Sequence, residues 1–360
     1  MRITHVDTLI VSLPVEQPLT TTLQTTKAVD TVLVTVRTDS GIHGISYLYA
    51  LGKSRCRVLQ AMVEDLGQLL LGEDPHYPER IWKKLWMDLE FLGHSGVATF
   101  GLAALDVAVW DIFGKAVGLP LYKLLGGYRD RVKACNARGL WLSNTVEELR
   151  YDAVTFLEEG FQAIKMRVGK EDPQEDLARV RAVREAIGDD ADLMVDASQG
   201  WTPDSAIQMG RRLEEFNIFW LEEPVPASDV DGLGKVSAAL EVPVAAGHTS
   251  FGKGDVRDLV ERRAVDVLTL DLQHSAGITE WKKAAAIAEA WGIPVAAHLF
   301  PHIHLHLMAH VPNGLLIEHV PWWDALFIDP PKVRHGFLEA PDRPGLGLEL
   351  DQAALERYAG

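Results

Sequence analysis

The chain has 360 residues, of which 47% are hydrophobic and 24% charged, as in an ordinary globular protein of one or two domains. Its formal net charge of −16 argues against general binding to nucleic acid or to an anionic membrane surface, which needs a basic face. Two cysteines, Cys56 and Cys135, argue against a disulfide framework and favour a cytoplasmic protein.

The N-terminal 50 residues predict a β-meander. His5 and Asp7 stand where a signal peptide would have its apolar core, and we expect no apolar run long enough to span a bilayer. Two β-branched strands are separated by a polar, Thr-rich loop from Glu16 to Lys27, and loops of that length are usually functional or mobile. Helical spacing then follows over 54–71, 78–92 and 97–118. This block predicts an α+β domain over residues 1–127.

From Arg131 onward, strands and helices alternate, which indicates a parallel sheet. We expect strands near 132–137, 162–167, 192–196, 218–222, 243–247, 266–271, 294–298 and 315–318. We expect helices over 145–159, 173–188, 203–215, 229–240, 253–263 and 278–291. Eight strands with right-handed crossovers predict a (β/α)₈ barrel over 128–325. The last crossover, about 303–313, is expected to be short, and 326–360 to return to the first domain.

Six of the expected strands end in a residue that can titrate or bind a ligand. They are Asp196, Glu222, His248, Asp271, His298 and Glu318. Each is separated from the next by about the length of one strand and one helix, and the C-terminal ends of barrel strands share one face. We therefore expect these six side chains to meet in one pocket.

Asp196, Glu222 and His248 lie at three successive strand ends. Acidic side chains at such positions would make a hard-oxygen site for Mg²⁺, completed by water and substrate. The alternative is that each side chain caps a helix or forms a salt bridge. For the evenly spaced set, the metal site is favoured.

Two further groups point to acid–base chemistry. Lys165 and Arg167 lie at i and i+2 on one strand and face the same side, which suits an anion, although a surface edge would also tolerate them. Asp271 beside His298 would raise the basicity of the imidazole and form a general base, although a structural histidine remains open. Glu318 is either a protonated acid that bonds a substrate oxygen or a helix cap.

Four histidines lie close together in the segment that follows His298. His302, His304, His306 and His310 are expected to be solvated residues of a helix or loop, because a spacing of i, i+2 makes no ligand face on a helix. Cys135 is expected to be a packing residue.

At this point the chain resembles the mandelate racemase branch of the enolase superfamily over nearly its whole length. The segments that carry the resemblance are LDVAVWDIFGKAVGLPLYKLLGG, GFQAIKMRVG, MVDASQGW, WLEEP, VPVAAGH, VLTLDLQHSAGITEW, GIPVAAHLFPHIHLHL and LLIEH. The resemblance implies a modified barrel covered by an α+β capping domain, which the C-terminal segment closes. Members abstract the proton α to a carboxylate and hold the enediolate on Mg²⁺.

The resemblance also implies roles for single residues. Asp196 and Glu222 would bind the metal ion, Asp271 and His298 would form the base dyad, and Glu318 would bond the substrate carboxylate. The capping loops near 16–27 and 47–52 would select the substrate. This implies Thr22, Tyr47 and Ser198 as substrate-binding residues.

Three positions depart from the family pattern. His248 stands where a glutamate ligand is usual, so Mg²⁺ should bind less well and Mn²⁺, Fe²⁺ or Zn²⁺ relatively better. Arg167 stands where a second catalytic lysine is frequent, and arginine is a poor base, which disfavours a two-base racemase. Ser198 stands where asparagine is frequent, which changes a substrate contact.

A single base suits a reaction on one face of the substrate. We expect His298 to remove the α-proton of a small hydroxy carboxylate such as an acid sugar, with Lys165 and Glu318 stabilising the enediolate and the β-hydroxyl leaving to give a 2-keto acid. The alternatives are a racemase, epimerase or lactone cycloisomerase on the same enediolate, and a catalytically silent family member. A homo-oligomer is expected from the resemblance.

Overall fold

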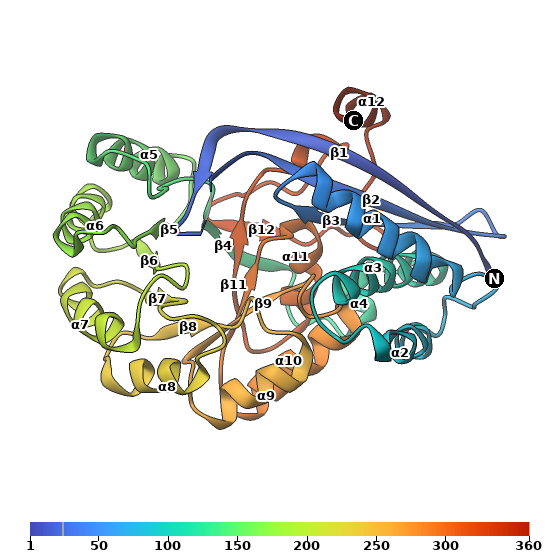
Figure 1. Ribbon diagram of the computed structural model, residues 1–360. Helices are drawn as coiled ribbons and strands as arrows, with labels where there is room; N and C mark the ends of the chain where they lie inside the picture. Colours follow the sequence, from blue (N-terminus) through green and yellow to red (C-terminus); the bar gives the residue numbers. More distant parts are fainter. Residues whose placement is uncertain (24, 360) are drawn as a thin grey trace.

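The computed structural model describes residues 1–23 and 25–359, which form a capping domain beside a closed barrel (Figure 1). The cap begins with a three-stranded antiparallel sheet of order β1-β2-β3: β1 (Ile3–Thr20), β2 (Thr25–Thr38) and β3 (His43–Ala50). Helical segments follow, namely α1 (Lys53–Gln68), α2 (Pro78–Asp88), η1 (Leu89–Phe91), α3 (Val97–Val117) and α4 (Leu121–Leu124). The expected order of a β-meander followed by three main helices is therefore confirmed.

The first two strands are longer than the sequence predicted. The expected loop from Glu16 to Lys27 is mostly strand, because β1 continues to Thr20 and β2 begins at Thr25. A register shift between Pro14 and Leu19 accommodates the prolines, which cannot donate to a sheet ladder. The β-branched threonines that follow favour the extended conformation.

The helix α3 (Val97–Val117) is the core of the cap. It is the one described helix that is long and apolar enough to cross a membrane by length and composition, although Asp106 and Asp111 interrupt its apolar run. However, 83% of its most apolar window is buried, and it packs against α1 and β3 as a core helix. It ends at Gly118 in the left-handed conformation (φ 73°), as predicted.

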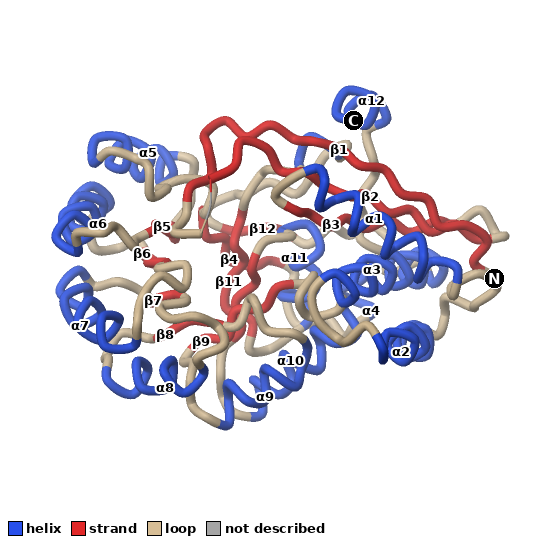
Figure 2. The backbone as a smooth tube through the Cα atoms, viewed as in Figure 1, coloured by secondary structure: helices blue, strands red, loops and turns tan. Residues whose placement is uncertain are grey.

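The second part is a closed barrel of eight parallel strands, which confirms the predicted fold class (Figures 1 and 2). The strands are β4 (Arg131–Asn136), β5 (Ala163–Arg167), β6 (Asp192–Asp196), β7 (Trp220–Glu222), β8 (Val244–Ala246), β9 (Val267–Asp271), β10 (Val295–His298) and β11 (Gly314–His319). Pairing of β11 with β4 closes the ring. Each lies within a few residues of its expected position, because short apolar runs bounded by turns suit buried barrel strands.

Helices cover the outside of the barrel. They are α5 (Val146–Glu158), α6 (Pro173–Ile187), α7 (Pro203–Leu213) with η2 (Glu214–Phe216), α8 (Val230–Ala239), α9 (Gly252–Glu261), α10 (Ile278–Ala290) and α11 (Pro301–His310). The last crossover, which was expected to be short and near 303–313, contains a ten-residue helix that begins at Pro301. Leu299 and Phe300 both adopt left-handed backbone angles and turn the chain directly into α11, with Pro301 at its first position.

The C-terminal segment contacts both the barrel and the cap, and it reaches the cap first near Gly345, which forms a bridge to Pro120. After η3 (Asp324–Leu326), the strand β12 (Phe337–Glu339) pairs antiparallel with β4 and extends the barrel. The helix α12 (Gln352–Tyr358) then lies near β1, and Ala359 forms a bridge to Val11. The division into 1–127, 128–325 and 326–360 stays a proposal, with part of the last segment serving the barrel.

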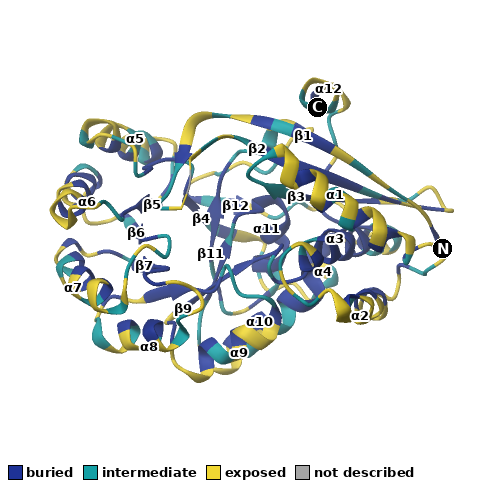
Figure 3. Cartoon of the chain, in the orientation of Figure 1, coloured by how far each residue is buried: buried dark blue, intermediate teal, exposed yellow. Residues whose placement is uncertain are grey.

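One buried side chain from each barrel strand forms the floor of the barrel interior. The set is Cys135, Ala163, Met194, Trp220, Ala245, Val267, Ala296 and Leu316. Figure 3 shows the barrel strands as buried and the outer helix faces as exposed. Cys135 is 1% exposed, so its predicted packing role is confirmed. Side chains two residues further along a strand face the same side, and they therefore lie above this floor.

Candidate active site

The catalytic candidates lie one layer above the floor, at the C-terminal ends of the strands. Lys165, Asp196, Glu222, His298 and Glu318 each follow a floor residue by two positions. The six strand-end residues that the sequence singled out thus surround one mouth, with Asp271 and His248 at the ends of β9 and β8. This geometry is what period-2 strands in a closed barrel produce.

A network of buried ion pairs joins the two cations of β5 to three carboxylates. Lys165 Nζ lies 2.8 Å from Glu222 Oε1 and 3.0 Å from Glu318 Oε1. Arg167 lies 3.5 Å from both Asp196 Oδ2 and Glu318 Oε1. Both cations face the interior, as their i, i+2 spacing predicted.

The network fixes the protonation of its members. Burial alone would lower the pKa of Lys165, but the charges of Glu222 and Glu318 outweigh it and raise that pKa. Burial would likewise raise the pKa of Glu318, but Lys165, His298 and Arg167 lower it. The expectation of a protonated Glu318 therefore differs from the structure, because three cationic or basic neighbours hold it as a carboxylate.

Arg167 is immobilised by its surroundings. Its guanidinium lies 4.4 Å from the centre of the Trp141 ring, and Nη1 donates to the carbonyl of Ala137. Stacking on an aromatic face between two carboxylates holds the guanidinium in place, and arginine is a poor base. Arg167 is therefore suited to hold an anion and unsuited to accept a proton.

The predicted dyad of Asp271 and His298 is present as a direct contact. His298 Nδ1 lies 2.9 Å from Asp271 Oδ2, and the carboxylate can only accept, so Nδ1 carries the proton and donates. Burial would lower the pKa of His298, but Glu318 and Asp271 raise it. The free Nε2 lies 3.8 Å from Glu318 Oε2, inside the mouth. This is the arrangement of a general base.

A second histidine on the same aspartate was not foreseen. His274 Nδ1 lies 2.9 Å from Asp271 Oδ1, and the backbone N–H groups of Gln273 and His274 donate to the same oxygen. The i, i+3 spacing of Asp271 and His274 was the available signal in the sequence, but the loop conformation that brings them together was not.

His248 faces the carboxylates of Glu222 and Glu223. Its Nδ1 lies 3.8 Å from Glu222 Oε1 and 3.4 Å from Glu223 Oε1. This nitrogen atom is buried and has no hydrogen-bond partner among the described residues. Burial and the charge of His298 lower the pKa of His248 well below its ordinary value. Neutral imidazoles and carboxylates are the side-chain types that bind divalent cations in proteins, so the predicted role of His248 as a metal ligand stays a prediction.

The carboxylates around this imidazole are crowded. Burial, reinforced by neighbouring carboxylates, raises the pKa of Glu222 and brings that of Glu223 to about 7. A bound cation would reduce the electrostatic repulsion between these carboxylates. The types of side chain present are therefore compatible with a divalent metal ion. In the conformation described, no group of three His, Cys, Asp or Glu side chains among residues 1–23 and 25–359 converges closely enough for an ion. Glu222 is paired with Lys165 instead. A metal ion bound by Glu222 would have to displace the Lys165 ammonium group.

Ser198 and Thr22 are brought together at the tip of the β1–β2 hairpin. Thr22 Oγ1 donates to the carbonyl of Ser198, whose own N–H and Oγ bond Asp196 Oδ1. Figure 2 shows the hairpin reaching across to the barrel near β5. A Cβ at Gly169 would lie 2.5 Å from Thr22 Cγ2, which is a steric clash. The hairpin tip can therefore pack closely at this position only because residue 169 is a glycine.

Tyr47 does not join the cluster at the mouth. It is 2% exposed, its hydroxyl lies 3.0 Å from His302 Nδ1, and its ring packs on Phe300 and Trp323. Tyr49, two residues on, contacts the loop after β9, because its backbone N–H donates to Gln273 Oε1. Burial and the charges of Asp271 and Glu318 raise the pKa of its hydroxyl. The substrate-binding role predicted for Tyr47 stays a prediction.

The expectation that His302, His304, His306 and His310 are solvated is wrong. The first three are at most 2% exposed, and all lie in α11. Each finds a polar partner, which is a carbonyl oxygen for His304, His306 and His310 and Asp324 for His302. Polar groups can be buried at little cost when they are hydrogen-bonded.

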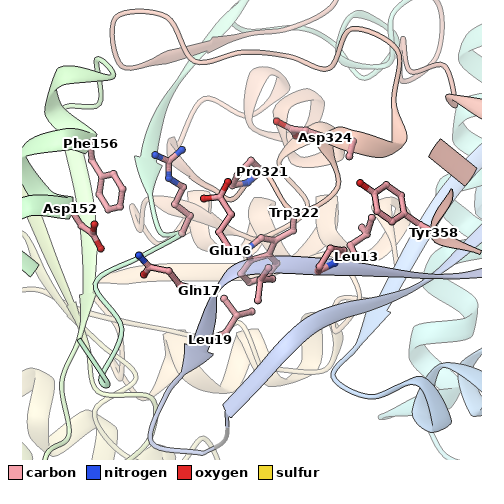
Figure 4. A pocket seen from close by; sticks show the side chains of 15 residues that line it. Leu13, Glu16, Gln17, Leu19, Asp152, Phe156, Pro321, Trp322, Asp324 and Tyr358 are labelled. Atoms are coloured by element: carbon pink, nitrogen blue, oxygen red, sulfur yellow. The ribbon is translucent and has the colours of Figure 1, made fainter. Parts of the chain in front are cut away.

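Two of the cavities lined by described residues bear on where a substrate would bind. One of about 10 Å³ lies under Lys165 and His298 and is too small for an organic ligand. Another of about 380 Å³ lies between β1, α5 and the segment after β11, with Trp322 and Tyr358 among its walls (Figure 4). The described lining of this larger cavity contains none of the predicted catalytic or metal-binding residues, so the geometry of the strand ends locates the chemistry better than cavity size does.

Comparison with known families and proteins agrees with this geometry. Residues 4–126 match the model of the mandelate racemase / muconate lactonizing enzyme N-terminal domain, and residues 148–354 match that of the enolase C-terminal domain-like family. An L-talarate/galactarate dehydratase of Salmonella typhimurium is 35% identical over 90% of this chain and 81% of its own length. A 3,6-anhydro-alpha-L-galactonate cycloisomerase of Streptomyces coelicolor is 36% identical over 92% of each chain.

A solved structure is similar over the whole molecule. The L-talarate dehydratase of Polaromonas sp., complexed with Mg and L-glucarate, superimposes with a TM-score of 0.94 at 34% identity. The match covers 100% of this chain and 97% of that one.

Proposed function

The chain belongs to the mandelate racemase / muconate lactonizing enzyme family of the enolase superfamily, and from this premise we propose that it is a metal-dependent dehydratase of an acid sugar. The observation that carries the proposal is the Asp271–His298 dyad at a mouth whose other basic side chains, Lys165 and Arg167, are paired with carboxylates. His298 is thus the single general base that we propose, and it would act on one face of the substrate.

His298 takes the α-proton through Nε2, while Asp271 holds Nδ1 and stabilises the imidazolium that forms. Lys165 and Arg167 bind the substrate carboxylate and stabilise the negative charge that develops on its oxygens. Glu318 stays ionised and keeps both cations in place. Asp196, Glu222 and His248 would hold a divalent cation, and Mg²⁺ accompanies several solved relatives. This cation would supply further charge stabilisation as a Lewis acid.

The second half of the reaction returns the proton. The imidazolium of His298 protonates the β-hydroxyl, the β-carbon–oxygen bond breaks, and water leaves as the double bond forms. The resulting enol tautomerises to a 2-keto acid. No oxidant or other co-reactant is consumed, because the substrate loses only the elements of water.

A cycloisomerase is the second candidate, because a relative with that activity matches 92% of this chain at 36% identity. A cycloisomerase would use the same base and the same charge stabilisation. Its product would be an isomer of the substrate and would keep all of its oxygen atoms.

The test is a screen of acid sugars, namely galactarate, L-talarate, arabinonate and xylonate, with added Mg²⁺ or Mn²⁺. We expect a 2-keto acid, detected as its semicarbazone, from at least one substrate with the wild type and none with His298→Asn. An isomer in the NMR spectrum without any keto acid would replace the dehydratase with the cycloisomerase. Conversion by neither route would contradict both.

The remaining expectations stay proposals. The substrate is a small hydroxy carboxylate, and the protein is expected to act as a homo-oligomer in the cytoplasm. Sedimentation velocity of the purified protein would test the oligomer directly.

A further inference from the structure

Asp271 is hydrogen-bonded to two imidazole side chains, those of His298 and His274. The proposed mechanism gives no role to His274. The side chain of Asp271 is fully buried, with Oδ2 bonded to His298 Nδ1 and Oδ1 bonded to His274 Nδ1, each at 2.9 Å. Both contacts are made by ring nitrogens that must donate, because an ionised carboxylate has no proton. The dyad is therefore a triad centred on the aspartate.

His274 is firmly oriented. Its ring meets Phe100 of α3 edge-on at 4.9 Å and lies 5.2 Å from Phe251. Phe100 belongs to the cap and Phe251 to the loop that begins at His248, so His274 is fixed at the junction of the cap with the loops after β8 and β9. Packing against these two rings orients the imidazole so that Nδ1 points toward Asp271.

The contact also governs the charge of the aspartate. Burial would raise the pKa of Asp271, but His274, and after it His298, lower it well below the ordinary value. The carboxylate is thus kept ionised in a fully buried position, where an unpaired charge would be costly.

Resting on the function proposed above, we propose that His274 is a positioning residue of the base, which anchors Asp271 Oδ1 so that Oδ2 presents to His298 Nδ1. His274 itself touches no reacting atom. Without the ring donor, Oδ1 keeps only the backbone N–H groups of Gln273 and His274. The carboxylate is then oriented less firmly, and the tautomer of His298 that leaves Nε2 free is less well fixed. Outer partners of this kind typically change activity by about 10- to 100-fold.

Two variants separate the donor from the packing. His274→Phe keeps an aromatic ring between Phe100 and Phe251 but removes the donor. His274→Asn places an amide N–H where Nδ1 stands and restores the donor with less packing. His76→Phe serves as the matched control, because His76 Nδ1 also bonds an aspartate, Asp74, on the surface of the cap.

The first measurement needs no substrate. In protein labelled with ¹⁵N on its histidine rings, the Nδ1–H signal of His298 is assigned by its loss in His298→Asn. We expect His274→Phe to lose this signal through exchange with water, and His274→Asn and His76→Phe to keep it. A signal unchanged in His274→Phe would overturn the inference, whether or not the protein proves to be a dehydratase.

The second measurement uses turnover on the substrate that the screen identifies. We expect kcat to fall by at least about tenfold in His274→Phe with KM within twofold, and to recover for the most part in His274→Asn. Equal losses in both variants would mean that the ring packs and does not position, and the inference would be withdrawn. Absence of any turnover in the wild type would contradict the proposed function alone.

Discussion

At the scale of single residues, the mouth of the barrel is a balance of buried charges. Lys165 and Arg167 offset Glu222, Glu318 and Asp196, with contacts between 2.8 and 3.5 Å. The identity of these residues was predictable, because each lies within two residues of the C-terminal end of a barrel strand. Their pairing was not, because it depends on which rotamers fit once all eight strands close.

The residue whose substitution is most informative is His248. A glutamate there adds a negative charge to the ligand set and removes a soft nitrogen. We expect calorimetry on metal-stripped protein to give His248→Glu a tighter affinity for Mg²⁺ and a smaller preference for Mn²⁺ or Zn²⁺ than the wild type. Asp196→Ala is the control and should lose the ion. An unchanged order of metals in His248→Glu would remove His248 from the ligand set.

At the scale of elements, the barrel was predictable and the hairpin was not. Short apolar runs ended by polar residues locate β4 to β11, since the period of two and the turns leave few alternatives. The segment from Glu16 to Lys27 has the composition of a loop, yet pairing between β1 and β2 extends it. Tertiary contacts of the tip with Ser198 and Gly169 stabilise that extension, and no local pattern reports them.

The hairpin tip gives a prediction at this scale. Thr22→Ala removes the hydrogen bond to Ser198 and the methyl group that rests on Gly169, so the tip should cover the mouth less of the time. We expect KM for the acid sugar to rise about threefold to tenfold with kcat little changed, since the lost contact amounts to about 1 kcal/mol. Thr4→Ala, which removes an exposed hydroxyl elsewhere on β1, should leave KM as in the wild type. If KM is equal in both variants, the tip does not contribute to substrate binding.

The start of α5 gives a second prediction at the same scale. Thr145 and Glu148 form a capping box, in which each side chain accepts from the backbone N–H of the other residue. Thr145→Ala should lower the free energy of unfolding by about 1 kcal/mol in urea titrations, whereas Thr145→Ser should cost much less. Equal stability of the alanine and wild-type proteins would show that the box does not hold the helix end.

At the scale of the whole molecule, the cap and the barrel share a buried polar contact. Asp106 of α3 accepts from the backbone N–H and the hydroxyl of Thr279 in α10, at 2.8 and 2.6 Å. Burial raises the pKa of Asp106 to about 7, even though the bonds from Thr279 oppose the shift. The two parts of the chain therefore meet at a group that titrates near neutrality.

The sign of this linkage follows from the raised pKa. In the folded protein, Asp106 binds its proton more tightly than in the unfolded chain, so its contribution to stability is complete below about pH 4 and is lost as the pH rises through 7. We expect the unfolding free energy of the wild type, measured relative to Asp106→Asn in urea, to fall by a few kcal/mol between pH 5 and pH 8. A difference that does not change with pH would show that Asp106 is already ionised.

The α-proton of the substrate tests the account most directly, because the whole arrangement of strand ends serves its removal by His298. The measurement is the rate at which purified protein with Mg²⁺ replaces the α-proton of its acid-sugar substrate by deuterium, followed by NMR in deuterated water. We expect incorporation or turnover with the wild type and none with His298→Asn, while Arg167→Lys retains a measurable rate. Exchange that persists in His298→Asn and disappears in Lys165→Met would contradict the account and make Lys165 the base.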